Sequence, residues 1–393
     1  MPHDQQDESV IDLCRQLIRT PSESGKEKQV IGLLRDYYSQ NGFTDLYIDP
    51  YGSLVASIKG KRQGPVLLLD GHIDTVPVPD PAAWSYPPFG AVIDENRLYG
   101  RGSSDMKGAV AAMAAAATQF LKASKGDFAG TLVLAGVVQE EMFEGVAARA
   151  VSEYCKPDMV VIGEATALNL NIGQRGRAEI KVETFGIPAH SANPEKGKNA
   201  VYQMAGIIQE VQKIRPPSHP ILGPGILELT DIKSSPYPGA SVVPSHCLST
   251  YDRRLLPGET LEDVLLPLKA VLHQYEEEGN RSPKVTLARG KESCYTGQVI
   301  EAERFFPGWL FDEGEWFVQK ALQCLKQAGL DSRLSYYNFC TNGSHYAGEA
   351  GIPTLGFGPS YEELAHTIDE YIELDQLLGA VRGYRALMEA FLT

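Results

Sequence analysis

Residues 65–74 read PVLLLDGHID, and this stretch determines the fold that we expect of the chain. Its first half is a short, continuous apolar run, which is typical of a β-strand covered on both faces. Its second half places His72 and Asp74, which can bind metal or move protons, just after that strand. Because ligands of open α/β sheets bind beyond the carboxyl ends of the strands, the stretch predicts a buried strand with a functional site at its end.

Further apolar runs of this kind occur along the chain, at residues 131–138, 159–163 and 353–358. Helical patterns alternate with them, and two examples are the Ala-rich stretch 106–121 and the amphipathic tail 374–391. Short apolar runs between amphipathic segments indicate buried strands between helices. The alternation therefore predicts an α/β fold in which helices cover both faces of a sheet.

The pattern changes between residues 178 and 295. Predicted strands and helices follow one another there in the order β-α-β-β-α-β, at residues 178–185, 199–214, 225–232, 246–255, 261–278 and 284–288. This is the order of a small two-layer, ferredoxin-like domain. Since 393 residues exceed what one hydrophobic core usually supports, we expect a larger domain in two parts, 1–177 and 296–393, with the smaller domain 178–295 inserted between them.

The composition argues against several classes of partner. The net charge of −14 disfavours nucleic acid and anionic membranes, because both are bound through Lys and Arg. No apolar run approaches the ~20 residues that span a bilayer, and the polar, acidic start of the chain differs from a secretion signal. The six cysteines are far apart and form no CxxC pair, which indicates reduced thiols. We therefore expect a cytoplasmic protein that acts on a small molecule.

Acidic and histidine side chains follow the other predicted apolar strands. Glu140 and Glu141 follow the second strand, Glu164 follows the third, and His366 lies in the loop after the fourth. Asp105 stands just before the Ala-rich helix. Taken alone, each has a structural explanation, because an acid before a helix is usually an N-cap and adjacent acids usually form a solvated turn. Their shared position at strand ends favours a single site instead.

Together these side chains predict a site for divalent metal ions. Two histidines and several acids form a nitrogen and oxygen ligand set that suits Zn, and also Co or Mn. Two metals ~3.5–4 Å apart need a shared carboxylate, for which Asp105 is the best candidate. One of Glu140 and Glu141 can bind metal while the other takes a proton from water. Asp74 can accept the second N–H of His72 and so fix its tautomer.

Six motifs carry a resemblance to a known family. They read LLLDGHIDTVP, LYGRGSSDMKGA, VVQEE, VIGEA, GIPAHSANPEKGKNA and AHTIDEYI. In this order and spacing the chain resembles the M20 metallopeptidase and deacylase family, which includes acetylornithine deacetylase, succinyl-diaminopimelate desuccinylase, aminoacylase and glutamate carboxypeptidase. The resemblance implies a mixed sheet like that of metal-dependent exopeptidases, with the inserted domain serving as a lid and for dimerisation.

Carried over by motif, the resemblance assigns ligands to two metal ions. It implies that His72 and Glu164 bind one metal and that Glu141 and His366 bind the other. Asp105 would bridge the two. Zn is the metal expected first, with Co and Mn as alternatives.

The resemblance also implies roles for five further residues. Glu140 would be the general base that activates water and then protonates the leaving amine. His190 corresponds to a histidine that helps to hold the carbonyl oxyanion, often from the partner subunit, which implies a homodimer. Arg254 aligns with an arginine that contacts the substrate carboxylate, a group that the guanidinium fork suits. Asn342 and Gly343 lie in the loop that lines the acyl or carboxylate pocket.

The chain departs from the common form of the family at three places. Gln139 stands where many members have Asp, and Ser241 stands where many have Asn before Val-Val-Pro. The loop 341–351, TNGSHYAGEAG, is also less Gly-rich than usual. The segments QEE, GQRGRAEI and SSPYPGASVVP resemble a subgroup labelled selenium-metabolism hydrolases, a label that names no established substrate.

These observations predict a two-metal enzyme that hydrolyses the amide or peptide bond of a small N-acyl amino acid or dipeptide. One alternative is a metallo-aminopeptidase, which would need an acidic anchor for a free amine in place of Arg254. Another is a catalytically silent, metal-bearing binding protein. The unligated Glu140 argues against silence, because a binding protein has no need of a free carboxylate beside its metals.

Overall fold

The structure of the chain is a computed structural model that describes residues 5–276 and 281–393. The internal contacts divide the chain into two units. The larger unit comprises the chain up to Gln174, together with Lys291–Glu301 and Leu310–Thr393. The smaller unit comprises Arg175–Gly290 and Ala302–Trp309.

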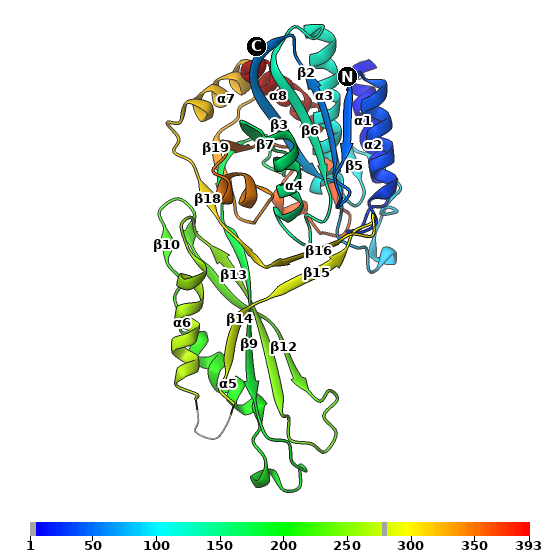
Figure 1. Cartoon of the computed structure of the whole chain (residues 1–393). Coiled ribbons are helices and arrows are strands. Elements are labelled where there is room, and N and C mark those ends of the chain that lie inside the picture. The colour runs from blue at the N-terminus through cyan, green and yellow to red at the C-terminus, as the bar shows by residue number, and fades with distance from the viewer. Residues whose placement is uncertain (1–4, 277–280) are drawn as a thin grey trace. The chain divides into compact units, whose positions relative to one another are not determined.

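A mixed β-sheet forms the centre of the larger unit (Figure 1). Its strands include β1 (Asp45–Ile48), β2 (Leu54–Lys59), β3 (Arg62–His72), β6 (Ala129–Val137), β7 (Met159–Ile162), β8 (Leu170–Gln174), β19 (Leu334–Tyr337) and β20 (Thr354–Gly356). They lie in the order β1-β2-β6-β3-β7-β20-β8, and β19 also pairs with β8. The four central strands β6, β3, β7 and β20 are parallel, whereas β2 is antiparallel to β6. The carboxyl ends of these four strands therefore share one edge.

Helices cover both faces of this sheet. The helices of the larger unit are α1 (Gln5–Ile18), α2 (Lys28–Gln40), α3 (Gly108–Ser124), α4 (Val146–Cys155), α7 (Trp316–Gln327) and α8 (Leu374–Leu392). In Figure 1, α4 lies in front of the sheet and α3 and α8 lie behind it. Two neighbouring residues of β3, which point to opposite faces of the sheet, agree with this arrangement. Asp70 accepts a hydrogen bond from Tyr346, whereas a Cβ on Gly71 would lie 3.0 Å from Val110 of α3. The predicted layered α/β fold is confirmed.

The central strand forms where the sequence predicts it. Leu67, Leu68 and Leu69 are fully buried, as expected for a strand covered on both faces. β3 is longer than the apolar run, because Arg62 also pairs with β6 at the exposed end of the sheet. Helix α3 begins at Gly108 and not at residue 106, because the two residues before Lys107 have non-helical backbone angles.

A small sheet joins two segments that are far apart in the sequence. It consists of β4 (Val92–Asp94), β5 (Arg97–Tyr99) and β21 (Tyr371–Glu373), in the order β21-β5-β4. Tyr371 pairs with Tyr99 in an antiparallel register. The segment that leads into Asp105 therefore runs beside the segment that follows His366.

The smaller unit has the β-α-β-β-α-β order that the sequence predicts. Its elements are β9 (Gly176–Phe185), α5 (Ala200–Val211), β12 (Ile226–Ser235), β13 (His246–Leu255), α6 (Leu261–His273) and β14 (Lys284–Leu287). The antiparallel sheet has the order β12-β13-β9-β14. Along β9, the buried side chains of Ala178, Ile180 and Val182 belong to the core formed with α5 and α6, and they alternate with half-buried polar ones. Its use as a lid or for dimerisation stays a prediction.

The bounds of the smaller unit differ from the predicted range 178–295, because its first segment is Arg175–Gly290 and it has a second segment. Residues 302–309 group with the smaller unit, because Phe305 and Phe306 of β17 (Phe305–Phe306) pair with β9, and nothing in the local sequence indicates that pairing. Helix α6 ends at His273, short of the predicted end at residue 278. Residues 277 and 278 lie outside the described residues.

Replacement of Gly383 in α8 tests the packing of helix against sheet. A Cβ at this position would lie 2.2 Å from the ring of Phe357, which is fully buried and cannot move aside cheaply. We expect Gly383→Ala to lower the free energy of unfolding by about 1–3 kcal/mol, the usual cost of overpacking. Urea denaturation measures it.

The matched control for this substitution is Gly32→Ala in α2. No heavy atom lies within 4 Å of a Cβ at Gly32, so the better helix propensity of Ala should raise stability by up to about 1 kcal/mol. Equal effects of the two substitutions would contradict the packing of Gly383 against Phe357.

Candidate metal centre

The candidate ligands gather at the carboxyl edge of the main sheet. His72 is the last residue of β3, Glu140 and Glu141 follow β6, and Glu164 follows β7. His366 lies in the loop after β20. Because these strands are parallel and adjacent, segments from separate parts of the chain meet there.

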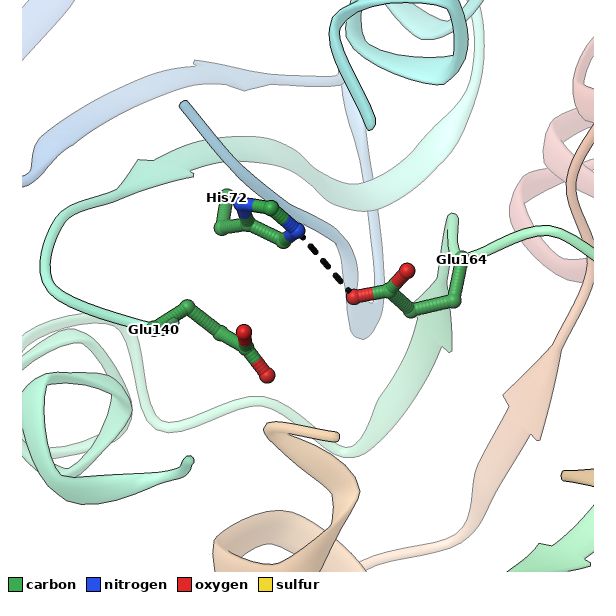
Figure 2. A group of neighbouring side chains, drawn as sticks. All are labelled: His72, Glu140 and Glu164. Carbon is green, nitrogen blue, oxygen red and sulfur yellow. Dashed lines mark ion pairs between the residues drawn. The ribbon is translucent and has the colours of Figure 1, made fainter. Parts of the chain in front are cut away.

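His72 lies at the centre of this group. Its Nε2 is 2.8 Å from Oδ1 of Asp105 and 3.3 Å from Oε1 of Glu164. Figure 2 shows Glu164 facing the imidazole, with the carboxylate of Glu140 pointing toward the same space. All of these side chains are buried or nearly so. The arrangement offers one imidazole nitrogen and several carboxylate oxygens to a shared position.

Asp105 connects the two histidines. Its second oxygen, Oδ2, lies 3.1 Å from Nε2 of His366, which is itself 3.0 Å from Oε2 of Glu141. The N-cap explanation of Asp105 does not hold, because α3 begins three residues later and the carboxylate faces the histidines. One carboxylate thus spans both parts of the cluster, which is the geometry that a bridging ligand requires.

Asp74 differs from the expectation for its carboxylate. Nδ1 of His72 is 2.9 Å from the backbone carbonyl of Asp74, and the nearer carboxylate oxygen is 3.7 Å away. The carboxylate instead accepts hydrogen bonds from the backbone N–H groups of Glu140 and Glu141, at 3.1 and 3.2 Å, and from the Ser24 hydroxyl at 2.7 Å. The Asp74 backbone therefore orients the imidazole, while the side chain holds the pair of glutamates in place.

The residues present fit a site for cations. Oε1 of Glu140 and Oε1 of Glu141 are both buried and find no hydrogen-bond partner among the described residues. Burial raises the pKa of Glu140 well above its ordinary value and the pKa of Glu141 to about 7. Hydrogen bonds to Asp105 and Glu141 raise the pKa of His366 to about 10. Buried negative charge in this amount favours the binding of positive charge, either protons or metal cations.

Two sets of three ligand atoms lie close enough together to hold an ion. One set is formed by His72, Glu140 and Glu164, and the other by His72, Asp105 and Glu141, with all ligand atoms within 4.8 Å of one another. The first set includes Glu140, which the family resemblance leaves unligated. The ion pair of Glu141 with His366 supports the resemblance, because it places Glu141 in the part of the cluster that contains the second histidine.

Two predicted site residues lie in the smaller unit. His190 is exposed, its Nδ1 accepts a hydrogen bond from the Ala192 backbone, and it forms an isolated β-bridge with Val242. Arg254 is partly exposed, and its Nε is 2.8 Å from Oδ1 of Asp252. Both side chains are accessible, and their roles toward a substrate stay predictions.

The side chain of Asn342 forms hydrogen bonds within the protein. It is only 2% exposed. Its Oδ1 accepts a hydrogen bond from the Gly145 backbone at 2.9 Å, and its Nδ2 donates to Asp70 at 3.0 Å. The N–H of Gly343 is likewise bonded, to the Thr341 hydroxyl. The amide of Asn342 thus has a structural role at both ends, and a contact of Asn342 or Gly343 with the substrate stays a prediction.

Two further buried acids near the cluster, Asp70 and Glu370, were not among the predicted site residues. Asp70 accepts hydrogen bonds from Asn342 and from the Tyr346 hydroxyl. Glu370 accepts hydrogen bonds from the segment that contains Asp105. An acid at the end of an apolar run, as in LLLD, is the signal that could have identified the first. No comparable local signal marks the second.

Within the described residues, none of the helices has both the length and the apolar content needed to cross a lipid bilayer.

An α/β sheet that presents histidines and buried acids at the carboxyl ends of its parallel strands offers a site for divalent metal ions, and the match to a family of peptidases makes the class of the protein a metal-dependent hydrolase. The chain belongs to the peptidase family M20/M25/M40, whose family model matches residues 68–390.

Relatives agree with this assignment, and a solved structure has the same fold. The chain is 31% identical over 386 residues to the uncharacterised protein YgeY of Escherichia coli K12, covering 95% of this chain and 92% of the relative. It is 31% identical over 399 residues to a succinyl-diaminopimelate desuccinylase of Cereibacter sphaeroides, covering 97% and 98%. The Bacillus subtilis protein YxeP, described as a dinuclear metal-binding peptidase, has the same fold with a TM-score of 0.70, 15% identity and 97% coverage of both chains.

Metal binding should stabilise the folded protein through Asp105. A ligand present at 100 times its Kd stabilises the state that binds it by about 2.7 kcal/mol. Addition of Zn²⁺ to chelator-treated protein should therefore raise the unfolding temperature in calorimetry, and Asp105→Asn should remove most of that rise. Asp252→Asn, in the smaller unit, should retain it. An unchanged rise in Asp105→Asn would contradict the bridging geometry.

Asn342 should matter for stability. Asn342→Ala leaves buried groups of Asp70 and Gly145 without their partner, and we expect a loss of about 1–3 kcal/mol in the free energy of unfolding. Urea denaturation measures this loss. The control is Asn338→Ala, since Asn338 is exposed and its bond to Glu362 is a surface contact. A raised KM with unchanged stability would support a substrate-binding role instead.

Proposed function

We propose that the protein hydrolyses the amide or peptide bond of a small N-acyl amino acid or dipeptide-like substrate at a centre of two divalent metal ions. The observation that carries the proposal is the carboxylate of Asp105, whose two oxygens each contact a different histidine. His72 and Glu164 would bind one metal ion, and Glu141 and His366 the other. Asp105 would bridge them.

The metal ions supply electrophilic chemistry when they are bound, because they polarise the scissile carbonyl and make water more acidic. The donor set of imidazole nitrogen and carboxylate oxygen suits Zn, and also Co and Mn. We propose Zn as the first metal to test.

Glu140 is proposed as the general base. Its carboxylate points toward the space between His72 and Glu164 (Figure 2). Its backbone N–H donates to Asp74, which holds the chain at this position. Glu141 differs from it, because Glu141 already pairs with His366. A buried carboxylate in this place can take a proton from the attacking water and deliver it to the leaving amine.

Substrate recognition would involve the smaller unit. Arg254 is proposed to bind the substrate carboxylate, since its guanidinium fork matches that group. It is held by Asp252, which also pairs with Arg177 at 3.0 Å. His190 is proposed to stabilise the oxyanion from the partner subunit of a homodimer. We propose the cytoplasm as the location of the enzyme.

The relatives support an acyl amino acid as the substrate class. Desuccinylases that cover nearly all of the chain act, by their name, on an acylated diamino acid. A screen of N-acyl amino acids and dipeptides beside amino-acid amides would test this class. Preference for the amides would favour an aminopeptidase instead.

Glu140→Gln is the decisive substitution. Because general acid–base catalysis contributes about 10²–10⁴-fold, kcat should fall by at least 10²-fold while bound metal stays at the wild-type level. Kinetics on a screened substrate and elemental analysis of the purified protein provide the two measurements.

The comparison variant is Glu141→Gln, which should lose metal as well as activity because Glu141 is a proposed ligand. A Glu140→Gln enzyme with a near wild-type rate would exclude Glu140 as the base. Loss of metal in both variants would show that Glu140 is a ligand.

A further inference from the structure

Glu370 is a fully buried acid that the proposed reaction does not use. It lies four residues after His366 and directly before β21. Its Oε2 accepts hydrogen bonds from the Arg101 guanidinium at 2.6 Å and from the Gly102 backbone at 3.0 Å. Its Oε1 accepts hydrogen bonds from the backbone N–H groups of Ser104 and Asp105, at 2.8 and 3.0 Å. One carboxylate thus binds four donors of a single five-residue segment.

The backbone around Glu370 shows why this contact is specific. β21 pairs with β5 up to the pair Tyr371 and Tyr99, and the Gly100 N–H then donates to the backbone carbonyl of Glu370 at 2.8 Å. Beyond that point the segment turns, since Gly102 has a left-handed φ of 83° and cannot continue the ladder. The side chain of Glu370 therefore takes up the N–H groups that the ladder leaves without partners.

The charge of Glu370 is part of this arrangement. A buried carboxylate is costly unless it is paired and hydrogen-bonded. Here Arg101 supplies the counter-charge and three backbone N–H groups complete the shell, so the carboxylate is anchored where it is. A glutamine would turn an NH₂ group toward some of these donors. An acid is therefore needed to accept all four hydrogen bonds. Because these bonds occupy both of its oxygens, Glu370 is not a candidate metal ligand.

We propose that Glu370 is a positioning residue that sets the affinity of the metal centre by fixing Asp105 relative to His366. Asp105 receives its hydrogen bond through its backbone, and its carboxylate contacts both histidines. His366 is on the same short segment as Glu370. Glu370 therefore joins the segment of the bridging ligand to the segment of a terminal ligand. This inference rests on the proposed metal centre.

The test measures metal affinity directly. Zn²⁺ is titrated into metal-free protein in competition with a chromogenic chelator, for the wild type, Glu370→Gln and Glu370→Asp. Residues that are hydrogen-bonded to metal ligands typically contribute 10–100-fold in metal affinity, so Glu370→Gln should raise the Kd for Zn²⁺ by about that factor. Glu370→Asp keeps the charge but is one methylene shorter, so it should also raise the Kd while it keeps its pairing with Arg101.

The matched control is Glu259→Gln in the smaller unit. Glu259 also binds an arginine, Arg253, and a backbone N–H, that of Leu256, but it contacts no proposed ligand. Its loss should lower the unfolding temperature of the metal-free protein without changing the Zn²⁺ affinity. A residue with a merely structural role at position 370 would behave in the same way.

The outcomes separate this inference from the proposed function. If the wild type binds no divalent metal, the proposed function fails. If the wild type binds metal and both Glu370 variants bind it equally well, the positioning role is overturned. Failure of both variants to fold would also overturn it, because Glu370 would then determine the fold of the unit and not the affinity of the centre.

Discussion

Buried negative charge at one edge of the main sheet is the constraint on which the rest of the structure depends. Four carboxylates and two histidines meet where the parallel strands end. Such acids are costly to bury unless hydrogen bonds hold them and protons or cations balance their charge. Hydrogen bonds from backbone N–H groups hold several of these acids in place. Asp74 accepts hydrogen bonds from the N–H groups of Glu140 and Glu141, and Glu370 accepts one from the N–H of Asp105.

The fold and most of the cluster were predictable because both depend on local patterns. An apolar run such as residues 65–70 predicts a strand between layers, and its Leu67, Leu68 and Leu69 are fully buried in one. Parallel strands place their carboxyl ends together, so residues directly after such runs, such as His72 and Glu164, are brought within 3.3 Å. The β-α-β-β-α-β order of the smaller unit was predictable for the same reason, since alternation along each strand shows which face is buried.

The supporting contacts were not predictable, because their partners come from distant parts of the chain. Asn342 bonds to Asp70, 272 residues away, and no local pattern distinguishes this amide from one that faces a substrate. Asp74 is two residues from His72, but its carboxylate accepts hydrogen bonds from the loop after β6. Only the tertiary structure brings that loop near. Family resemblance identified which residues gather at the centre. It did not identify which atoms hold them there.

The division of the chain into units has a consequence for how the protein can be taken apart. The chain passes between the units at four places, after Gln174, Gly290, Glu301 and Trp309. The smaller unit is therefore not one continuous segment of the chain, because strand β17, which pairs with β9, belongs to the separate segment Ala302–Trp309. A graft that exchanged only residues 175–290 would leave the edge of β9 beside Ala178 and Arg177 without its partner. Transfer of this unit between relatives requires both segments to move together.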